Sequence, residues 1–380
     1  MANGVLIGAL EFYGDSEKYS GDPGTVTNPY CISDIKDLKA CSKLTTISNY
    51  ILTEDINFRE YNRMCDGNFY IPIDEYFDFN GFAFWNLNIR CMDTNNEETY
   101  YNVFNFNCLD ISKDRYIKKC KLVNFIHNNN YSCILFNFDY VDSRVVNSSV
   151  YFDDADISMH IIQHIVYYTR FAPLICVNWG SDEKDEKLFL RNSVIKLSGR
   201  EEVNQSNYES MVSELFRHYY DGVYIYMYDC TIIFNDYKIV IMKHPINNAR
   251  NQCFMPYASF TDSVIVTGSI IFELSDKYTS DSSKTAFLFL DSTSQHDNVN
   301  TLIDCNFTFV NNNEENYPNF YISISDSGQT TPLFINKDKF GENVRIAESD
   351  NFYLLNTEQL KDSNYLIGMG LMIDNEGELP

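Results

Sequence analysis

Two acidic segments are the first candidates for chemistry in this sequence. Asp153-Asp154-Ala155-Asp156 carries three carboxylates in four residues, and residues 182–186 carry four in five. A carboxylate pair can act as acid and base in glycoside hydrolysis, and carboxylate oxygens are preferred ligands of Ca²⁺. The alternative is a solvated acidic loop, since acidic residues are frequent throughout the chain. We keep Asp153 and Asp154 as candidate ligand-binding residues.

Histidines and basic residues give weaker signals for catalysis. His160 and His164 have a spacing that would place both imidazoles on one helix face, but Ile161-Ile162-Gln163 between them lacks the glutamate of a zinc-protease motif. The group Lys243, His244 and Arg250 has no paired carboxylates beside it, which a lyase would need. The sequence therefore predicts no catalytic residue, no metal and no cofactor. Whether the protein is an enzyme stays open, with a non-enzyme favoured.

Three tyrosines form the most regular candidate binding motif. Tyr224, Tyr226 and Tyr228 alternate with aliphatic residues, so on a strand their rings would share one face. An exposed row of aromatic rings can stack on sugars or bury a subunit contact at small entropic cost. The alternative is an inward-facing aromatic row of the core. We keep both interpretations.

Charge and hydropathy exclude several classes of partner. The chain has 380 residues and a net charge of −24, which repels phosphate backbones and anionic lipid surfaces. Nucleic acid is therefore a poor candidate partner. The first residues lack the basic segment of an export signal, and no apolar stretch reaches the roughly 20 residues that span a bilayer. We expect a protein that folds in a reducing cytoplasm, without membrane insertion.

The cysteines indicate buried thiols. There are eleven, dispersed along the chain without a C-x-x-C pair or metal-finger spacing. Free cysteine is among the most buried residue types, so reduced core thiols are favoured over zinc sites or disulfides. Cys108, Cys120, Cys230 and Cys305 occupy the same place in a recurring phrase. We predict that all four point inward.

That recurring phrase indicates how the chain is organised. A small Cys or Ser is followed by apolar residues that alternate with others, and an Asn, Asp or Gly suited to a tight corner often precedes it. The phrase occurs seven times, at residues 107–111, 119–122, 147–152, 192–197, 229–234, 268–272 and 304–309.

Uneven spacing between the phrases favours one architecture. A rigid repeat would keep its period, whereas a coil whose turns carry loops of variable length would not. Parallel stacking of such phrases places like residues above one another every ~4.8 Å, and parallel crossovers are overwhelmingly right-handed. The predicted fold class is all-β: a single-stranded right-handed parallel β-helix with short inserted and capping helices.

Residues 29–91 carry a more specific resemblance. A short helix around residues 32–38, with Ser33 as N-cap, precedes Tyr50–Asn57, then Ile71-Pro72-Ile73, then an Asn-Gly turn within residues 77–89. This order resembles the first coils of pectin-lyase-like and haemagglutinin-like β-helices. One departure is Phe82, which follows Gly81 where those families usually have a second glycine.

Two segments break the strand pattern. Residues 205–219 place apolar side chains on one helical face, which predicts an inserted helix. Near the end, Asn356 and Gln359 have the spacing of an N-cap and its N3 partner, before Leu360 and Tyr365. The second helix is predicted to seal the last coil against edge-to-edge pairing.

The predicted domains are an N-terminal attachment arm (1–28), the β-helix (29–336) and a C-terminal coil and cap (337–380). The arm is interrupted by glycines and prolines, and its apolar run Val5-Leu6-Ile7 is the candidate attachment anchor.

The resemblance implies a class of protein. β-helices of this kind, acidic and without an export signal, occur in bacteriophage virions as tailspikes, fibres or appendages. The expected function is therefore a structural or host-recognition virion protein, assembled in the host cytoplasm. Its expected partners are other virion proteins, its own copies, with a trimer favoured, and a possible host surface glycan. The alternatives are a polysaccharide depolymerase on the same fold and a non-catalytic glycan-binding protein.

Overall fold

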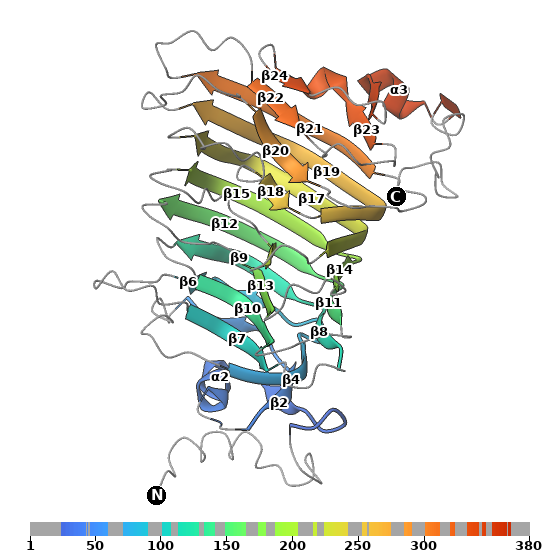
Figure 1. Cartoon of the computed structure of the whole chain (residues 1–380). Coiled ribbons are helices and arrows are strands. Elements are labelled where there is room, and N and C mark those ends of the chain that lie inside the picture. Colours follow the sequence, from blue (N-terminus) through green and yellow to red (C-terminus); the bar gives the residue numbers. More distant parts are fainter. Residues whose placement is uncertain are drawn as a thin grey trace, which may run out of the picture. The chain divides into compact units, whose positions relative to one another are not determined.

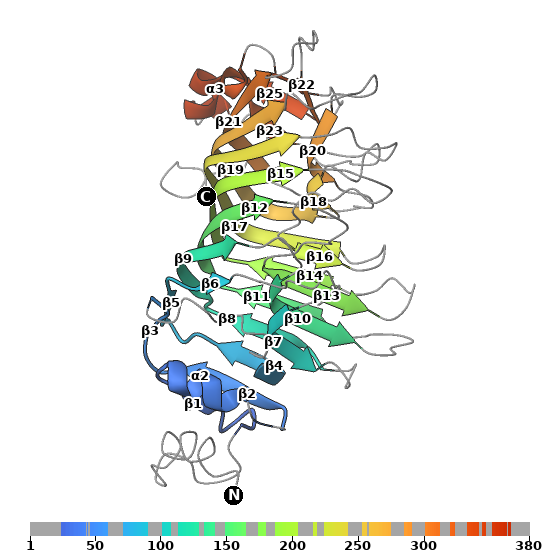
Figure 2. The same cartoon turned by 90° about the vertical axis from the view of Figure 1, so that its left-hand side faces the viewer.

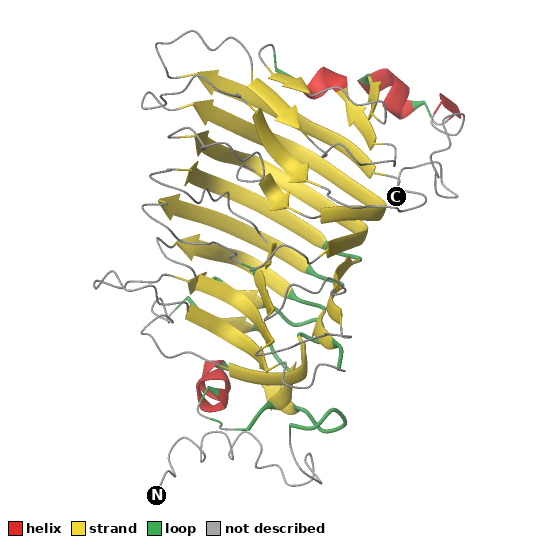
Figure 3. Ribbon diagram, viewed as in Figure 1, coloured by secondary structure: helices red, strands yellow, loops and turns green. Residues whose placement is uncertain are grey.

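The chain folds into stacked β-strands with very few helices (Figures 1 and 3). The computed structural model describes residues 24–42, 44, 46–59, 71–89, 101–107, 113–128, 133–140, 149–164, 174–179, 187–203, 216–218, 224–241, 253–256, 258–274, 285–290, 301–311, 320–323, 333–341, 344–346, 352–362 and 364–365. The attachment arm's Val5, Leu6 and Ile7 lie outside these residues.

Two compact units make up the chain. Unit 1 comprises Met1–Gln163, Thr169–Phe189 and Glu214–Tyr224, and unit 2 comprises His164–Tyr168, Leu190–Ser213 and Ile225–Pro380. In chain order, the elements up to residue 191 are β1 (Tyr30–Ile32), α2 (Ile35–Cys41), β2 (Ser48–Leu52), β3 (Ile56–Asn57), β4 (Ile71–Asp78), β5 (Phe84–Trp85), β6 (Asn88–Ile89), β7 (Tyr101–Asn107), β8 (Arg115–Lys118), β9 (Lys121–Asn128), β10 (Cys133–Tyr140), β11 (Ser149–Asp153), β12 (Asp156–His164), β13 (Ile175–Trp179) and β14 (Lys187–Arg191).

The remaining elements are β15 (Val194–Val203), β16 (Phe216–His218), β17 (Tyr224–Ile241), β18 (Cys253–Pro256), β19 (Ala258–Leu274), β20 (Thr285–Leu290), β21 (Thr301–Asn311), β22 (Phe320–Ser323), β23 (Leu333–Asn336), the 3-10 turn η2 (Lys337–Lys339), β24 (Val344–Ile346), β25 (Phe352–Leu355) and α3 (Thr357–Lys361).

The strand pairing of unit 1 describes a coil. The pairings among its described strands are parallel, and most fall into three stacks: β4–β7–β10–β13–β16, β4–β8–β11 and β5–β9–β12. The first strands add β1–β2–β4 and β3–β5, and β6 also pairs with β9. From β7 to β12 the chain visits the three stacks in turn, twice. Figure 2 shows β7, β10, β13 and β16 as successive rungs of the first stack.

Unit 2 follows the same rule with two stacks. The ladder β15–β17–β19–β21–β23–β25 is parallel throughout, and β18–β20–β22–β24 form a second parallel sheet. From β17 to β25 the chain alternates between the two sheets. A chain that returns to the same sheet once per turn, always in the same direction, is a parallel β-helix. The predicted all-β parallel β-helix is therefore confirmed.

Columns of like residues fill the core. In unit 1 the inward residues Phe77, Ile117 and Phe152 are in register, and each has 0% of its surface exposed. The rings of Phe106 and Phe138 stack with centroids 4.3 Å apart. Each buried side chain of this size contributes about 1.5 to 3 kcal/mol of hydrophobic stabilisation. The alternating apolar pattern of the sequence is thus the pattern of these columns.

The recurring phrases at residues 119–122, 192–197 and 229–234 begin at a corner of the coil, whereas residues 149–152 of the phrase at 147–152 lie on β11 and that coil turns later, at Asp154-Ala155. Lys119 and Asp154 have positive φ angles of 52° and 53°, and each precedes a buried small residue, Cys120 or Ala155. Backbone bonds join the two corners: Lys119 N–H donates to the Asp153 carbonyl, and Asp156 N–H donates to that of Cys120, both at 2.8 Å. In unit 2, Asn192-Ser193 and Asp229-Cys230 repeat the arrangement. Asn and Asp suit it because they tolerate the left-handed conformation.

Three of the four predicted inward thiols are confirmed. Cys120, Cys230 and Cys305 are free and buried. Burial raises the pKa of the Cys120 thiol well above its usual value, and it raises the pKa of Cys230 and Cys305 to about 12. Cys108 lies outside the described residues.

Several local predictions are corrected or confirmed. The N-cap of α2 is Asp34, not Ser33, because Asp34 accepts from the backbone N–H groups of Lys36 and Asp37 while Ser33 donates to the Asp37 carboxylate. The Asn80-Gly81 turn is formed as expected, with φ angles of 52° and 87° and a bond from Phe82 N–H to the Phe79 carbonyl. Asn356 and Gln359 form the predicted capping box of α3.

The predicted helix over residues 205–219 is wrong where it can be compared. Phe216–His218 form strand β16, which pairs in parallel with β13, so the inter-strand bonds of the coil prevail over a weak helical periodicity. Residues 205–215 lie outside the described part of the chain. His160 and His164 lie on strand β12 and not on a helix.

Candidate binding face on the first unit

One outer face of unit 1 carries a ladder of aromatic rings. Tyr76 of β4, Tyr116 of β8 and Tyr151 of β11 are in register, and all three are half-buried. Phe189 of β14 continues the row, since its ring stacks on that of Tyr151. Their neighbours Phe77, Ile117 and Phe152 point into the core, so strand alternation turns the ladder outward. We call these four residues the tyrosine ladder.

Ring geometry decides what the ladder can bind. The centroids of Tyr116 and Tyr151 are 4.9 Å apart and those of Tyr151 and Phe189 are 5.0 Å apart, with interplanar angles of 10° in both pairs. Rings stacked in this way cover one another's faces and present their edges and hydroxyls. A sugar that stacks on tyrosine needs an open ring face. The middle of the ladder therefore suits hydrogen bonding and edge contacts better than sugar stacking.

A charged column runs beside the ladder. Asp78, Lys118 and Asp153 are in register on β4, β8 and β11, two residues beyond the three tyrosines. The Lys118 ammonium lies 4.7 Å from the ring centroid of Tyr76 and 5.1 Å from that of Tyr116. Such cation–π contacts contribute about 0.5 to 1 kcal/mol at exposed sites. The face thus already holds one cation against its rings.

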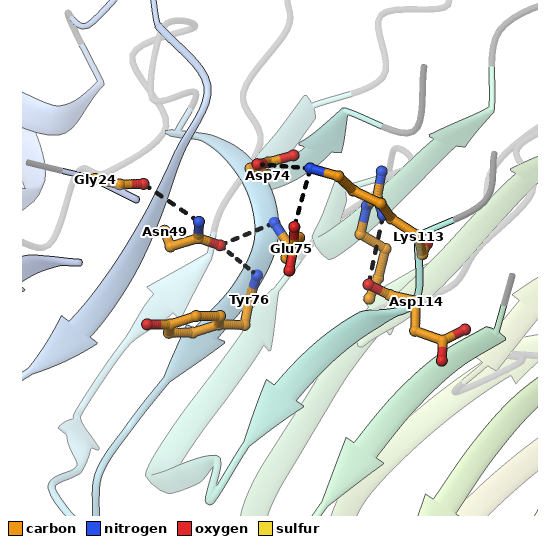
Figure 4. Close-up of polar contacts among 8 residues, drawn as sticks. Gly24, Asn49, Asp74, Glu75, Tyr76, Lys113 and Asp114 are labelled. Atoms are coloured by element: carbon orange, nitrogen blue, oxygen red, sulfur yellow. Dashed lines mark hydrogen bonds and ion pairs between the residues drawn. The ribbon is translucent and has the colours of Figure 1, made fainter. Parts of the chain in front are cut away.

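A polar cluster lies next to the ladder, on the side away from the charged column. It consists of Asp74, Glu75, Lys113 and Asp114 (Figure 4). The Lys113 ammonium is 2.9 Å from Glu75 and 3.4 Å from Asp74, and the bond to Glu75 is the main cause that raises the pKa of Lys113. Asp114 accepts from the Ser149 N–H of the next coil at 2.8 Å and from the Tyr116 hydroxyl at 3.3 Å. These carboxylates are therefore occupied by neighbours from adjacent coils.

Buried Asn49 holds the backbone beside this polar cluster in place. Its side-chain oxygen accepts from the N–H groups of Glu75 and Tyr76, both at 2.9 Å, and its amide nitrogen donates to the Gly24 carbonyl (Figure 4). These bonds satisfy two backbone N–H groups at the point where β4 stops pairing with β7 and begins to pair with β8. Nearby, the Tyr76 hydroxyl donates to the Val26 carbonyl, and burial, followed by Asp78 and Glu75, raises the pKa of Tyr76.

The sequence-predicted candidates divide between the two units. Asp153 belongs to the charged column, and Asp154 is the exposed corner residue after it. In unit 2, Tyr226 and Tyr228 are half-buried while Met227 is buried, so these two rings face outward and not into the core. The Tyr224 side chain, residues 182–186, Lys243, His244 and Arg250 lie outside the described residues. Within the described part of the chain, no group of three His, Cys, Asp or Glu side chains could hold a metal ion.

Sequence reasoning missed the ladder itself. Tyr116, Tyr151 and Phe189 each stand three residues before the left-handed corner residue of their coil, namely Lys119, Asp154 and Asn192. Tyr226 has the same place before Asp229. The only regularity of this aromatic position in the sequence is its constant distance from the next left-handed residue, and not a constant repeat period.

Comparisons with known proteins add nothing to these observations: no family model, no curated protein and no solved structure matches this chain. No helix in the described part is long and apolar enough to cross a membrane.

Proposed function

We propose that the protein is a structural or host-recognition component of a bacteriophage virion, of the tailspike, fibre or appendage kind. In this role the β-helix serves as a rigid support, and the chain assembles as a homo-oligomer, with a trimer favoured. The outer face that carries the tyrosine ladder contacts either another virion protein or a host surface glycan.

The tyrosine ladder is the observation that carries the proposal. An outward row of in-register rings flanked by carboxylates is rigid at its centre, because the Tyr151 ring stacks on Tyr116 of one neighbouring coil and on Phe189 of the other. Tyr and Phe lose little side-chain entropy when such a surface is covered. Phenol and carboxylate oxygens can also accept further hydrogen bonds from the hydroxyl groups of a polysaccharide, which need partners of fixed geometry.

The virion role is tested by mass spectrometry of purified phage particles from the source of this gene. Peptides of the chain should be found in intact particles, and their absence from particles that infect normally would refute the proposal. Light scattering after size-exclusion chromatography should give three times the chain mass, or six times where two trimers associate, and a monomer or dimer would contradict the trimer.

The binding face is tested on an array of bacterial polysaccharides and by pull-down of virion proteins. Tyr151→Ala combined with Asp153→Ala should lower binding at least about tenfold, or about 1.4 kcal/mol. The control Tyr365→Ala removes an exposed tyrosine of unit 2 and should leave binding unchanged. Equal binding by both variants would exclude this face. Release of new reducing ends from a bound polysaccharide would instead favour the depolymerase.

A further inference from the structure

The last rung of unit 2 is an open sheet edge. β25 pairs with β23 in parallel, with Phe334 opposite Tyr353 and Ile335 opposite Leu354. No strand within the described residues pairs with the other side of β25. Its backbone therefore offers a row of N–H and C=O groups on that side.

Two consecutive side chains of this last rung are exposed, although the rung below them is buried. Phe334 and Ile335 are 2% and 0% exposed, whereas Tyr353 and Leu354 above them are 43% and 40% exposed. The Tyr353 ring stacks on Phe334 with centroids 5.2 Å apart and an interplanar angle of 17°. Because Phe334 covers one face of this ring, the exposed face points away from the coil. Two apolar side chains thus lie open along the edge.

Among the described residues, this edge lacks the features that keep natural edges from pairing. Protected edges carry Lys, Pro, a bulge or a covering element. The sequence of β25 is Phe-Tyr-Leu-Leu, with no charge in a chain whose net charge is −24. The helix α3 that follows has no buried residue. An uncharged, apolar edge of this kind is a template for another strand.

We propose that β25 pairs with β25 of a second copy, antiparallel and about a two-fold axis. Two identical edges are complementary in this arrangement, since each supplies the donors and acceptors that the other lacks. Two chains of net charge −24 repel each other. The four residues of β25 are uncharged, so pairing them places no like charges of this strand side by side. The contact goes beyond the proposed function: it would join monomers into dimers, or trimers into hexamers.

The experiment measures mass by light scattering over a range of protein concentrations. Leu354→Lys should weaken the self-association at least about tenfold, because a two-fold contact places the new charge beside its own symmetry mate. Tyr353→Lys should act in the same direction. Ile162→Lys is the matched control, since Ile162 has an equal exposure of 40% on strand β12, and it should change nothing. Circular dichroism checks that each variant keeps its strands.

A cysteine scan over residues 352–355 locates the axis. Under oxidation, one position near the axis should form a disulfide between copies, and positions farther from it should not. Unchanged mass for both lysine variants, or no crosslink at any of the four positions, would overturn the proposal. So would a full-length chain that does not self-associate until residues 366–380 are deleted, because that segment would then be the occupant of the edge. None of these outcomes depends on whether the protein belongs to a virion.

Discussion

The two capping helices share one local design and differ in what they bury. Each begins with a capping box: Asp34 with Asp37 in α2, and Asn356 with Gln359 in α3. Helix α2 lies against β1 and β4 and buries Ile35, Leu38 and Cys41, whose exposures are 6%, 0% and 0%. Helix α3 buries none of its residues.

The carboxylates that accept hydrogen bonds near the starts of the two helices also differ in burial. Asp37 is only 4% exposed, and its Oδ2 atom accepts from Ser33 N–H, Ser33 Oγ and Asp34 N–H. At the other helix, the Thr357 N–H donates to the exposed carboxylate of Asp338 in η2 at 2.7 Å. A capping box therefore starts a helix, while an apolar face decides whether the helix closes a core. Helix α2 closes the first coil, and α3 leaves Tyr353 and Leu354 of the last rung exposed.

The largest effect is expected from truncation of the two helix leucines. Leu38→Ala should lower the free energy of unfolding by about 2 to 5 kcal/mol, because it leaves a cavity in a closed core. Leu360→Ala removes the same atoms from a half-buried position in α3 and should cost less than about 1 kcal/mol. Urea unfolding followed by circular dichroism measures both. Equal losses would show that α3 also closes its coil.

The pH dependence of the two helices should have opposite signs. Burial is the main cause that raises the pKa of Asp37 to about 6, so its folded form binds a proton more tightly than its unfolded form. Its contribution is present below pH ~4 and is lost as the pH rises through about 6, on the order of 2 kcal/mol. The bond from Thr357 N–H lowers the pKa of Asp338, so that contribution is lost as the pH falls below ~4.

Carboxyl chemical shifts recorded by NMR during a pH titration measure both groups directly. Asp37→Asn should remove the loss of stability between pH 4 and 6, and Asp338→Asn serves as the control that leaves this window unchanged. An Asp37 titration midpoint near 4 would contradict the predicted slope at α2.

The smallest effect separates the two N-caps. Asp34→Ala and Asn356→Ala each remove one capping side chain, at a cost of about 1 kcal/mol to the helix concerned. Only Asp34→Ala should lower global stability, because α2 is packed on the core. Asn356→Ala should increase hydrogen exchange in α3 alone. Global destabilisation by Asn356→Ala would count against an open C-terminal rung.

The coil itself could be predicted from the sequence because its determinants are local and repeated. A corner that needs a left-handed residue followed by a small one selects Asp229-Cys230 or Asn192-Ser193 wherever it recurs. Inward columns likewise need apolar residues at every second position of a strand. Caps were predicted nearly as well, since they depend on spacings of three residues. Ser33 and Asp34 are both good N-caps, and only the packed structure shows that Ser33 instead donates to Asp37.

What lies side by side on the outer face was decided by the tertiary structure. Tyr76, Tyr116, Tyr151 and Phe189 stand 40, 35 and 38 positions apart in the sequence, so no constant period reveals the ladder. Bonds between coils set this register, because loops of different length can join strands that stay aligned. The same holds for Tyr353 and Leu354: their alternation is that of any core strand. No described strand covers these two residues. This depends on where the stack of strands ends, and not on the sequence of the four residues of β25.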